Sequence, residues 1–265
     1  MKKLRAIRHS YLNWDLPESV YFFSLHKCAS TLFSDYILKH VDGLLLVNQS
    51  KRIFMNKPDA LVSVRYRKRG HVYGPLRLSG GGTGPVWKQL VQPVIAPEFI
   101  RDKIAYVMIR DPRDILVSSY YSFGFTHPMS ALPEIRVKQE ERRAMIQSMS
   151  LDAYVLEFAK SQQIHFKNVG DVLERCPRAV LLRYEDMISD FDNFLEKLRR
   201  YLPIRDEVAE EIRRRSRPKD REEQGSHKRS GQVGGFRSKL EAHTVTELNR
   251  ELSGILSRYG YEADT

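Results

Sequence analysis

Short apolar runs alternate along the chain with longer segments whose apolar residues recur at helical spacing. Residues 20–25, 104–109 and 179–184 are the clearest runs, and each is rich in β-branched or aromatic residues or in leucine, which is typical of a buried strand. Weaker strands are predicted at 44–47 and within 62–77. The helical spacing predicts helices at about 32–37, 97–102, 111–123, 151–174, 191–202, 208–215 and 241–258.

This alternation predicts an α/β fold with a central, mostly parallel sheet that helices flank on both faces. A single domain over residues 1–265 is the economical interpretation, although two small domains would also suit this length. Residues 126–150 are charged and punctuated by prolines, so we expect an irregular, mobile segment there and a second one at 216–236. Ligands of such sheets bind where strands end and helices begin, which singles out the loops at 27–31, 110–113 and 184–186.

Charge and cysteine content narrow the class of partner. The net charge of +11 and the pI near 9.6 favour anionic partners, but nucleic acid, nucleotides, acidic glycans and membrane surfaces all satisfy that condition. Cys28 and Cys176 are too few for a disulfide framework and lack the spacing of metal ligands, which favours a reducing, intracellular setting. No stretch approaches the roughly 20 apolar residues that span a bilayer, so we expect a cytoplasmic protein without a membrane anchor.

The first of the three loops has the features of an anion site. Small residues at 28–30 would let backbone amides approach an anion, a helix begins near Thr31, and Lys27 adds a full positive charge. The segment is not a Walker A sequence, because its lysine precedes the small residues instead of following a glycine. An ordinary strand-to-helix turn capped by Ser30 or Thr31 is the alternative interpretation.

The second loop adds a basic residue at a strand end. Arg110 precedes a helix that Asp111 would cap, and Ser118 follows two helical turns later, about 12 Å along the axis. Arginine suits bidentate phosphate recognition, and the serine could close the same pocket. A salt bridge from Arg110 to Asp111 or Asp114 is the alternative.

Together these segments resemble the sulfotransferases that use 3′-phosphoadenosine 5′-phosphosulfate (PAPS). The lysine-led loop at 27–32, the Arg-Asp-Pro-Arg-Asp helix at 110–114, Tyr-Glu-Asp at 184–186 and a late segment at 229–236 occur in the family's order. The resemblance implies a fold like that of P-loop nucleotide hydrolases, the product 3′,5′-ADP and no metal requirement. It assigns donor binding to Lys27, Cys28, Ala29, Ser30, Thr31, Leu32, Arg110, Ser118, Tyr184, Lys228, Arg229, Ser230 and Gly231.

The sequence also departs from the family pattern. Ala29 stands where a glycine is usual, which is acceptable if its φ is negative or its methyl group is accommodated. Ser230, Gly235 and Phe236 replace the lysine, aspartate and tryptophan of the late segment. Donor binding is therefore expected to depend more on Lys228 and its basic neighbours.

The resemblance gives Lys27 a catalytic role, because its ammonium would stabilise charge on the leaving oxygen during in-line transfer to a hydroxyl or amine. The acceptor also needs a general base, and the family's Lys-Thr-His triplet is absent. His71 lies in the segment of matching order and is the first candidate, whereas His26 is expected to point away from the donor. Further alternatives are His127, His165 and Glu98; Arg77 and Tyr73 are expected to line the acceptor site.

The function predicted from the sequence is transfer of a sulfuryl group from PAPS to a small-molecule, lipid or glycan acceptor. One alternative is a nucleotide or small-molecule kinase of similar fold, although the Walker lysine and the magnesium-holding pattern are not evident. A second and less favoured alternative is a basic nucleic-acid-binding protein, although the sequence contains no known nucleic-acid-binding motif. The basic run at 213–219 is a solvated helix end, part of a lid over the donor, or a contact for an acidic acceptor.

Overall fold

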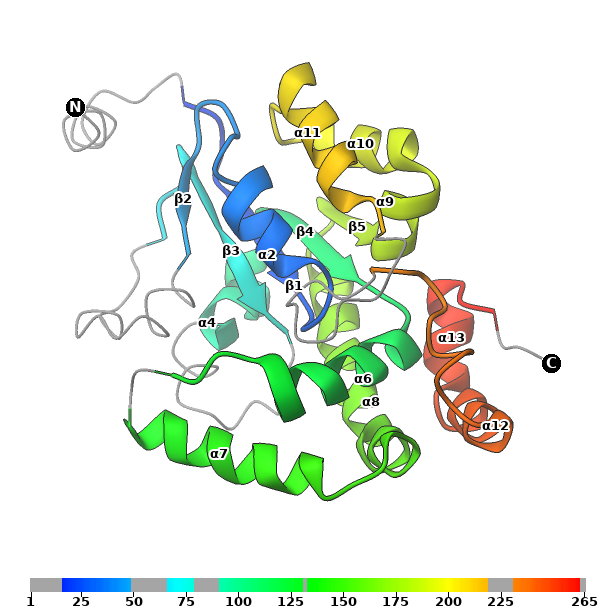
Figure 1. Cartoon of the computed structure of the whole chain (residues 1–265). Coiled ribbons are helices and arrows are strands. Elements are labelled where there is room, and N and C mark those ends of the chain that lie inside the picture. The colour runs from blue at the N-terminus through cyan, green and yellow to red at the C-terminus, as the bar shows by residue number, and fades with distance from the viewer. Residues whose placement is uncertain (1–15, 49–65, 79–90, 131–132, 219–230, 263–265) are drawn as a thin grey trace.

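The sheet is the organising element of the molecule. The computed structural model describes residues 16–48, 66–78, 91–130, 133–218 and 231–262. Its five strands lie in the order β2-β3-β1-β4-β5, and every neighbouring pair is parallel (Figure 1). The strands are β1 (Val20–Ser24), β2 (Leu45–Val47), β3 (His71–Arg77), β4 (Ile104–Ile109) and β5 (Ala179–Arg183). The predicted α/β class with a parallel sheet is confirmed.

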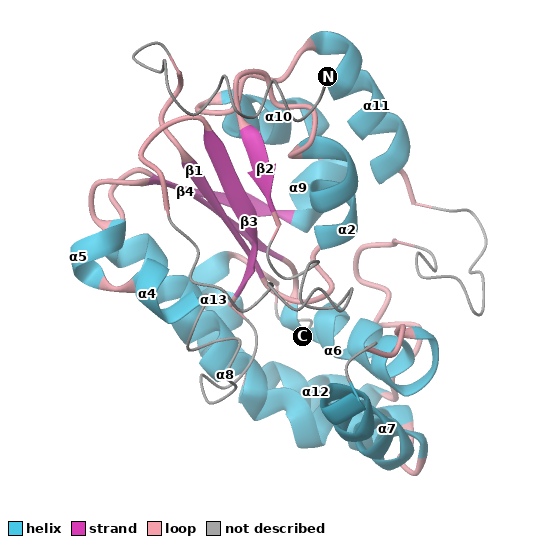
Figure 2. Ribbon diagram, turned by 90° about the vertical axis from the view of Figure 1, so that its left-hand side faces the viewer, coloured by secondary structure: helices cyan, strands magenta, loops and turns pink. Residues whose placement is uncertain are grey.

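Helices cover both faces of the sheet, as the alternation in the sequence predicts. Figure 2 shows the sheet between α4, α5 and α8 on one side and α2, α9, α10 and α11 on the other. The helices on these faces are α2 (Ser30–Leu32) with its continuation η1 (Phe33–Ile37), α4 (Gln92–Ile95), α5 (Pro97–Ile100), α8 (Leu151–Arg175), α9 (Tyr184–Ser189), α10 (Phe191–Arg199) and α11 (Asp206–Ser216). Beyond the sheet edge lie α6 (Pro112–Tyr121), η4 (Ser122–Thr126), α7 (Pro133–Gln147), α12 (Ala242–Glu251) and α13 (Ser253–Tyr259).

The core is built around the two central strands. Every residue of β1 and of β4 is buried, because helices cover both faces of a parallel sheet. This explains why these strands read in the sequence as unbroken apolar runs with no alternation of polar residues. Phe22 of β1 stacks on Phe33 of η1 with ring centroids 4.3 Å apart, which fixes the first helix against the strand that precedes it.

The strand order determines where a ligand can bind. The chain passes from β1 outward to β2 and β3 on one side, and then crosses to β4 and β5 on the other. Such a reversal leaves a crevice at the carboxyl end of the central strand. The loop after β1 and the start of α6 after β4 meet at this edge.

Two local expectations are wrong. The irregular backbone expected across 126–150 is absent from most of that stretch, because Pro133–Gln147 forms α7. Its Glu, Lys, Arg and Gln residues are good helix formers, and its low content of apolar residues hid the periodicity. The loop expected at 184–186 is the first turn of α9. Among the described residues, no helix has the length and apolar character needed to cross a membrane.

Candidate active site

The loop after β1 turns sharply. Lys27 has a φ of 64°, and Ala29, which precedes α2, has a φ of 53°. Both residues therefore occupy the left-handed region, which costs a residue with a Cβ roughly 1–2 kcal/mol. Of the two conditions that would make an alanine acceptable here, a negative φ is not met: the alanine replaces the family's glycine at a position where the backbone has the conformation that favours glycine. Strain of this kind concentrates at functional sites.

The sharp turn decides which side chains of the loop face outward. Lys27, Ala29, Ser30, Thr31 and Leu32 line a cavity above the sheet edge. Cys28 does not line it, because its side chain is fully buried and its Sγ–H donates to the carbonyl of His26 at 3.5 Å. Burial raises the pKa of the Cys28 thiol. Cys28 could therefore take part in donor binding through its backbone amide, which is the role that the small residues at 28–30 predict.

Arg110 connects this loop to α6. Asp111 caps α6 as predicted by accepting from the amide of Arg113 at 2.9 Å. The Arg110 guanidinium donates to Asp114 at 3.2 Å and to the carbonyl of Lys27 at 3.4 Å. The salt bridge to Asp114 that the sequence left as an alternative does form, yet Arg110 still lines the cavity. Its Nε is buried and has no hydrogen-bond partner among the described residues.

Residues 231–236, late in the chain, contact the same end of the sheet. The hydroxyl of Tyr184 donates to the carbonyl of Gly231 at 2.6 Å, and the Arg110 guanidinium lies over the Tyr184 ring at 4.3 Å. Asp114 accepts from the backbone amides of Gly234 at 2.9 Å and Phe236 at 3.1 Å. Sequence reasoning missed this anchoring role of Asp114. Lys228, Arg229 and Ser230 lie outside the described residues.

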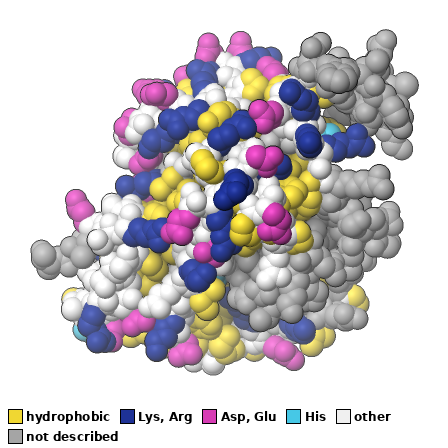
Figure 3. Space-filling model, turned by 180° about the vertical axis from the view of Figure 1, so that it is seen from behind, with side chains coloured by type: hydrophobic (Ala, Val, Ile, Leu, Met, Phe, Trp, Pro, Cys, Tyr) yellow, Lys and Arg dark blue, Asp and Glu magenta, His cyan; other side chains and the backbone are white. Residues whose placement is uncertain are grey.

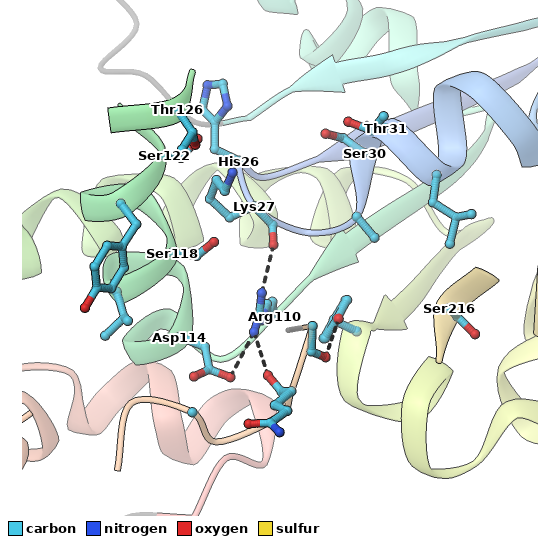
Figure 4. A pocket seen from close by; sticks show the side chains of 18 of the residues that line it. His26, Lys27, Ser30, Thr31, Arg110, Asp114, Ser118, Ser122, Thr126 and Ser216 are labelled. Carbon is cyan, nitrogen blue, oxygen red and sulfur yellow. Dashed lines mark hydrogen bonds and ion pairs between the residues drawn. The ribbon is translucent and has the colours of Figure 1, made fainter. Parts of the chain in front are cut away.

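These elements enclose one cavity of about 600 Å³ (Figure 4). Ser118 of α6 faces it, in the place that the sequence predicted relative to Arg110. The described residues that line the cavity include five lysine or arginine side chains and two carboxylates, so an anionic ligand is favoured. The basic side chains are those of Lys27, Arg77, Arg110, Arg215 and Lys239, and the carboxylates are those of Asp35 and Asp114.

Comparison with protein families supplies the identification. A family model described as a sulfotransferase domain matches residues 90–250, which is more than half of the chain. This chain belongs to the sulfotransferase family. The matched region contains Arg110, Ser118 and Tyr184 but begins after the Lys27 loop, so the place of that loop in the site rests on the structure.

Solved structures resemble this sulfotransferase in fold. Retinol dehydratase in complex with retinol and PAP is 13% identical, with a TM-score of 0.51 over 91% of this chain and 82% of the other. A mouse sulfotransferase, SULT7A1, complexed with PAP is 17% identical, with a TM-score of 0.49 over 92% of this chain and 88% of the other. No curated protein matches the sequence.

Arg77 of this sulfotransferase is a partly buried cation that lines the cavity. Its guanidinium lies at the carboxyl end of β3 and donates to Ser30 Oγ at 2.8 Å and to the carbonyl of Leu25 at 3.3 Å. Within the described part of the chain it forms no salt bridge. Burial lowers its pKa to about 10, so the group keeps its charge at neutral pH. A desolvated cation without a carboxylate is costly, which favours a ligand that supplies the negative charge.

The structure does not bring His71 to the cavity. His71 starts β3, and its amide donates to Ser19 Oγ at 3.2 Å, beside the start of β1. Because the strands are parallel, His71 lies at their amino ends, whereas Lys27 lies at their carboxyl ends. The two ends are roughly 20 Å apart along β3. Its ring bonds to the carbonyl of Arg69 and stacks on Tyr73. His71 as the general base is therefore wrong.

His26 lies where the sequence did not place it. The alternation of side chains along a strand suggested that adjacent His26 and Lys27 point to opposite sides. Both line the cavity, because the chain leaves the extended conformation at Lys27. Burial lowers the pKa of His26 well below its usual value, and the positive charges of Arg77 and Lys27 lower it further.

Proposed function

We propose that the cavity binds PAPS and that the enzyme transfers the sulfuryl group to a hydroxyl of a small-molecule, lipid or glycan acceptor. The observation that carries this proposal is the hydrogen bond from Arg110 to the carbonyl of Lys27. This hydrogen bond connects the two basic segments that resemble the family's donor-binding motifs, and both segments line one cavity. The donor, when bound, supplies a sulfuryl group activated by its bond to a phosphate.

The residues fit such a donor. The buried Arg110 Nε still has an N–H to donate, and a phosphate oxygen would satisfy it. Arg110 and Ser118 would hold the 3′-phosphate, and Tyr184 would contact the adenine side. Lys27 would stabilise charge on the leaving oxygen.

The loop hydroxyls complete the other end of the site. Ser30 lies beside Arg77, and Thr31 faces the same cavity (Figure 4). Both would hydrogen-bond the 5′-phosphosulfate, while Arg77 would balance its charge. Gly231 would border the nucleotide through its backbone, and Lys228, Arg229 and Ser230 stay predictions because they lie outside the described residues.

The solved structures support the choice of donor class. Both the mouse sulfotransferase and retinol dehydratase carry PAP, and the second also carries retinol. We extend to this chain only the nucleotide, because a structure that is 13% identical shows a shared fold and does not identify the acceptor. A cytoplasmic location stays a prediction.

A nucleic-acid-binding role has less support. On the face seen in Figure 3, Lys and Arg side chains are interspersed with Asp and Glu side chains instead of forming one basic tract. The basic run of α11 is similarly neutralised in part: Arg214 and Arg215 both pair with Glu211, and Arg213 pairs with Asp192.

Thermal stabilisation separates these functions. The chain is heated alone, with 3′,5′-ADP, with ATP–magnesium and with a random oligonucleotide. We expect a rise in melting temperature with 3′,5′-ADP that exceeds the other two, because only this ligand carries free 3′- and 5′-phosphate monoesters on one nucleoside, one for each basic segment. Stabilisation by ATP–magnesium alone would favour the kinase, and stabilisation by the oligonucleotide alone would favour nucleic-acid binding.

A further inference from the structure

We propose that His26 is the general base of the reaction: its imidazole faces the cavity beside Lys27 and would accept the proton of the acceptor hydroxyl. This inference rests on the function proposed above. It replaces His71 and uses a residue from the same loop as the catalytic lysine.

Geometry carries the proposal. His26 and Lys27 are consecutive and line one cavity, so an acceptor oxygen near the leaving-group end of the donor would also lie near the imidazole. The His26 ring makes an edge contact with Phe123 of η4, with centroids 5.6 Å apart. Figure 4 shows the ring on the side of the cavity where Ser122 and Thr126 of η4 lie. Arg110 and the predicted 3′-phosphate site lie on the other side of Lys27.

The other bases around the cavity are less suitable. The described lining residues include two carboxylates and two histidines. Asp114 is occupied by Arg110 and by two backbone amides. Asp35 pairs with Lys39 at 3.7 Å, and more than a third of its side chain is exposed. His127 follows η4, farther along the chain from the lysine, and is the competitor that the experiment must separate.

The surroundings of His26 keep it ready to accept a proton. Arg77 from β3, His165 from α8, Lys27 from its own loop and His127 after η4 all face it. Burial and these groups lower its pKa, so the ring is neutral at pH 7 and has a lone pair. The negative charges of a bound donor oppose the cations and would raise the pKa toward neutrality, where a general base is most effective.

The chemical step balances with these groups alone. The acceptor oxygen forms a bond to sulfur as its proton passes to an imidazole nitrogen of His26. The bond from sulfur to the bridging phosphate oxygen breaks, and that oxygen keeps the electron pair. Lys27 stabilises the resulting charge on 3′,5′-ADP, and His26 later releases its proton to solvent.

Ser122 indicates where the acceptor would sit. Its hydroxyl lines the cavity, the side chain is 4% exposed, and its Oγ has no hydrogen-bond partner in the described part of the chain. A buried polar atom of this kind needs a partner, and an acceptor between Ser122 and His26 would supply one. Ser118, Ser122 and Thr126 lie four residues apart, so one helical stripe leads from the donor side to the acceptor side.

The test compares His26→Gln with two matched histidine variants, His71→Gln and His127→Gln. Turnover of radiolabelled PAPS is measured with water and with the best acceptor from a panel of alcohols and phenols, and the dissociation constant of 3′,5′-ADP is measured for each variant. We expect His26→Gln to lower turnover by about 10²- to 10⁴-fold and to change the dissociation constant by less than about threefold. We expect His71→Gln to leave both quantities unchanged.

A second readout is independent of turnover. The His26 C2 proton signal, assigned by its loss in His26→Gln, is followed by NMR against pH with and without 3′,5′-ADP. We expect a titration below the usual histidine range in the free enzyme and an upward shift when the nucleotide binds.

Each contrary result points to a different error. Turnover within threefold of the unmodified enzyme in His26→Gln, or a large loss confined to His127→Gln, would overturn the assignment. A fall in nucleotide affinity that matches the loss of turnover would give His26 a binding role instead and would also overturn it. Failure of the unmodified enzyme to bind 3′,5′-ADP would refute the proposed function itself.

Discussion

At the scale of single residues, the loop after β1 shows how backbone strain and chemistry coincide. The positive φ values of Lys27 and Ala29 break the two-residue alternation of a strand. As a result His26 and Lys27 both line the cavity, while Cys28 between Lys27 and Ala29 is fully buried. The unfavourable conformation is held by its surroundings: Phe33 donates its amide to the Ala29 carbonyl at 3.1 Å, and Arg77 bonds to Ser30.

Substitution of Ala29 tests this strain. Glycine adopts a φ of 53° without steric cost, whereas valine adds a branched Cβ to an unfavourable conformation. We expect Ala29→Gly to leave the free energy of unfolding within about 1 kcal/mol of the unmodified enzyme, because relief of strain offsets the lost methyl contact. We expect Ala29→Val to lower it by about 1–3 kcal/mol. Urea denaturation measures both, and equal stability of the glycine and valine variants would argue against a left-handed residue 29.

At the scale of elements, α6 organises the site. Asp111 caps its start, and Arg113 reaches Asn249 of α12 at 2.6 Å and the carbonyl of Glu262 at 2.8 Å. Asp114, one residue on, holds Arg110 and the amides of the late segment. The first turn of α6 thus links the donor loop to the segment at 231–240 and to the C-terminal helices.

This linkage predicts a strong effect for Asp114→Asn. The substitution removes the charge that balances buried Arg110 and weakens two hydrogen bonds to backbone amides. We expect the free energy of unfolding to fall by about 2–4 kcal/mol, because a partly buried charge loses its partner. We also expect 3′,5′-ADP to recover part of this loss, since its phosphate would bond to the same arginine.

A surface ion pair provides the control for that variant. Asp192 bonds to Arg213, but 83% of its side chain is exposed. Exposed pairs contribute little, so Asp192→Asn should change the stability by less than about 1 kcal/mol. Equal effects of the two substitutions would contradict the anchoring role of Asp114.

At the scale of the whole molecule, partly buried histidines determine part of the response to acid. Burial, with a smaller contribution from the positive charge of Arg142, lowers the pKa of His165 to about 4. The unfolded chain takes up a proton near pH 6.5, whereas the folded enzyme resists protonation until about pH 4. The stability associated with neutral His165 is therefore complete above pH 6.5 and is lost as the pH falls from 6.5 toward 4.

Denaturation at several pH values checks this sign. We expect the free energy of unfolding to decrease between pH 7 and pH 5, and His165→Gln to remove about 1 kcal/mol of that decrease. The exposed His40 provides the matched control, so His40→Gln should leave the decrease as it is in the unmodified enzyme. A His165→Gln variant with the full acid sensitivity would contradict the buried, neutral state of that ring.

Local residue patterns predicted some elements of this molecule and missed others. The core strands were predictable, because residues 104–109 and 20–25 are apolar enough to be buried on both faces. The positions of Arg110 and Ser118 follow from helix geometry within one segment, so they were predictable too. Helix α7 was not, because its stability comes from polar helix formers and contacts with η4 instead of an apolar stripe.

The acceptor side of the site could not be predicted from local sequence patterns. The direction of the His26 side chain depends on the positive φ angles at Lys27 and Ala29, which these residue types disfavour. The alternation of side chains along a strand therefore predicted the wrong direction for His26. His71 appeared suitable because its order along the chain matches the family's base, yet order does not say which end of a strand a residue occupies. Asp114 contacts residues more than 110 positions away, a pairing that no local pattern contains.

Calorimetric binding of 3′,5′-ADP and of 5′-AMP to the unmodified enzyme and to Arg110→Gln tests the central claim most directly. We predict that the unmodified enzyme binds 3′,5′-ADP at least tenfold more tightly than 5′-AMP, because the 3′-phosphate bonds to Arg110 and Ser118. We predict that Arg110→Gln abolishes this preference while 5′-AMP affinity changes little. Equal affinities for the two nucleotides in the unmodified enzyme, or a preference that survives Arg110→Gln, would contradict the assignment of this cavity to PAPS.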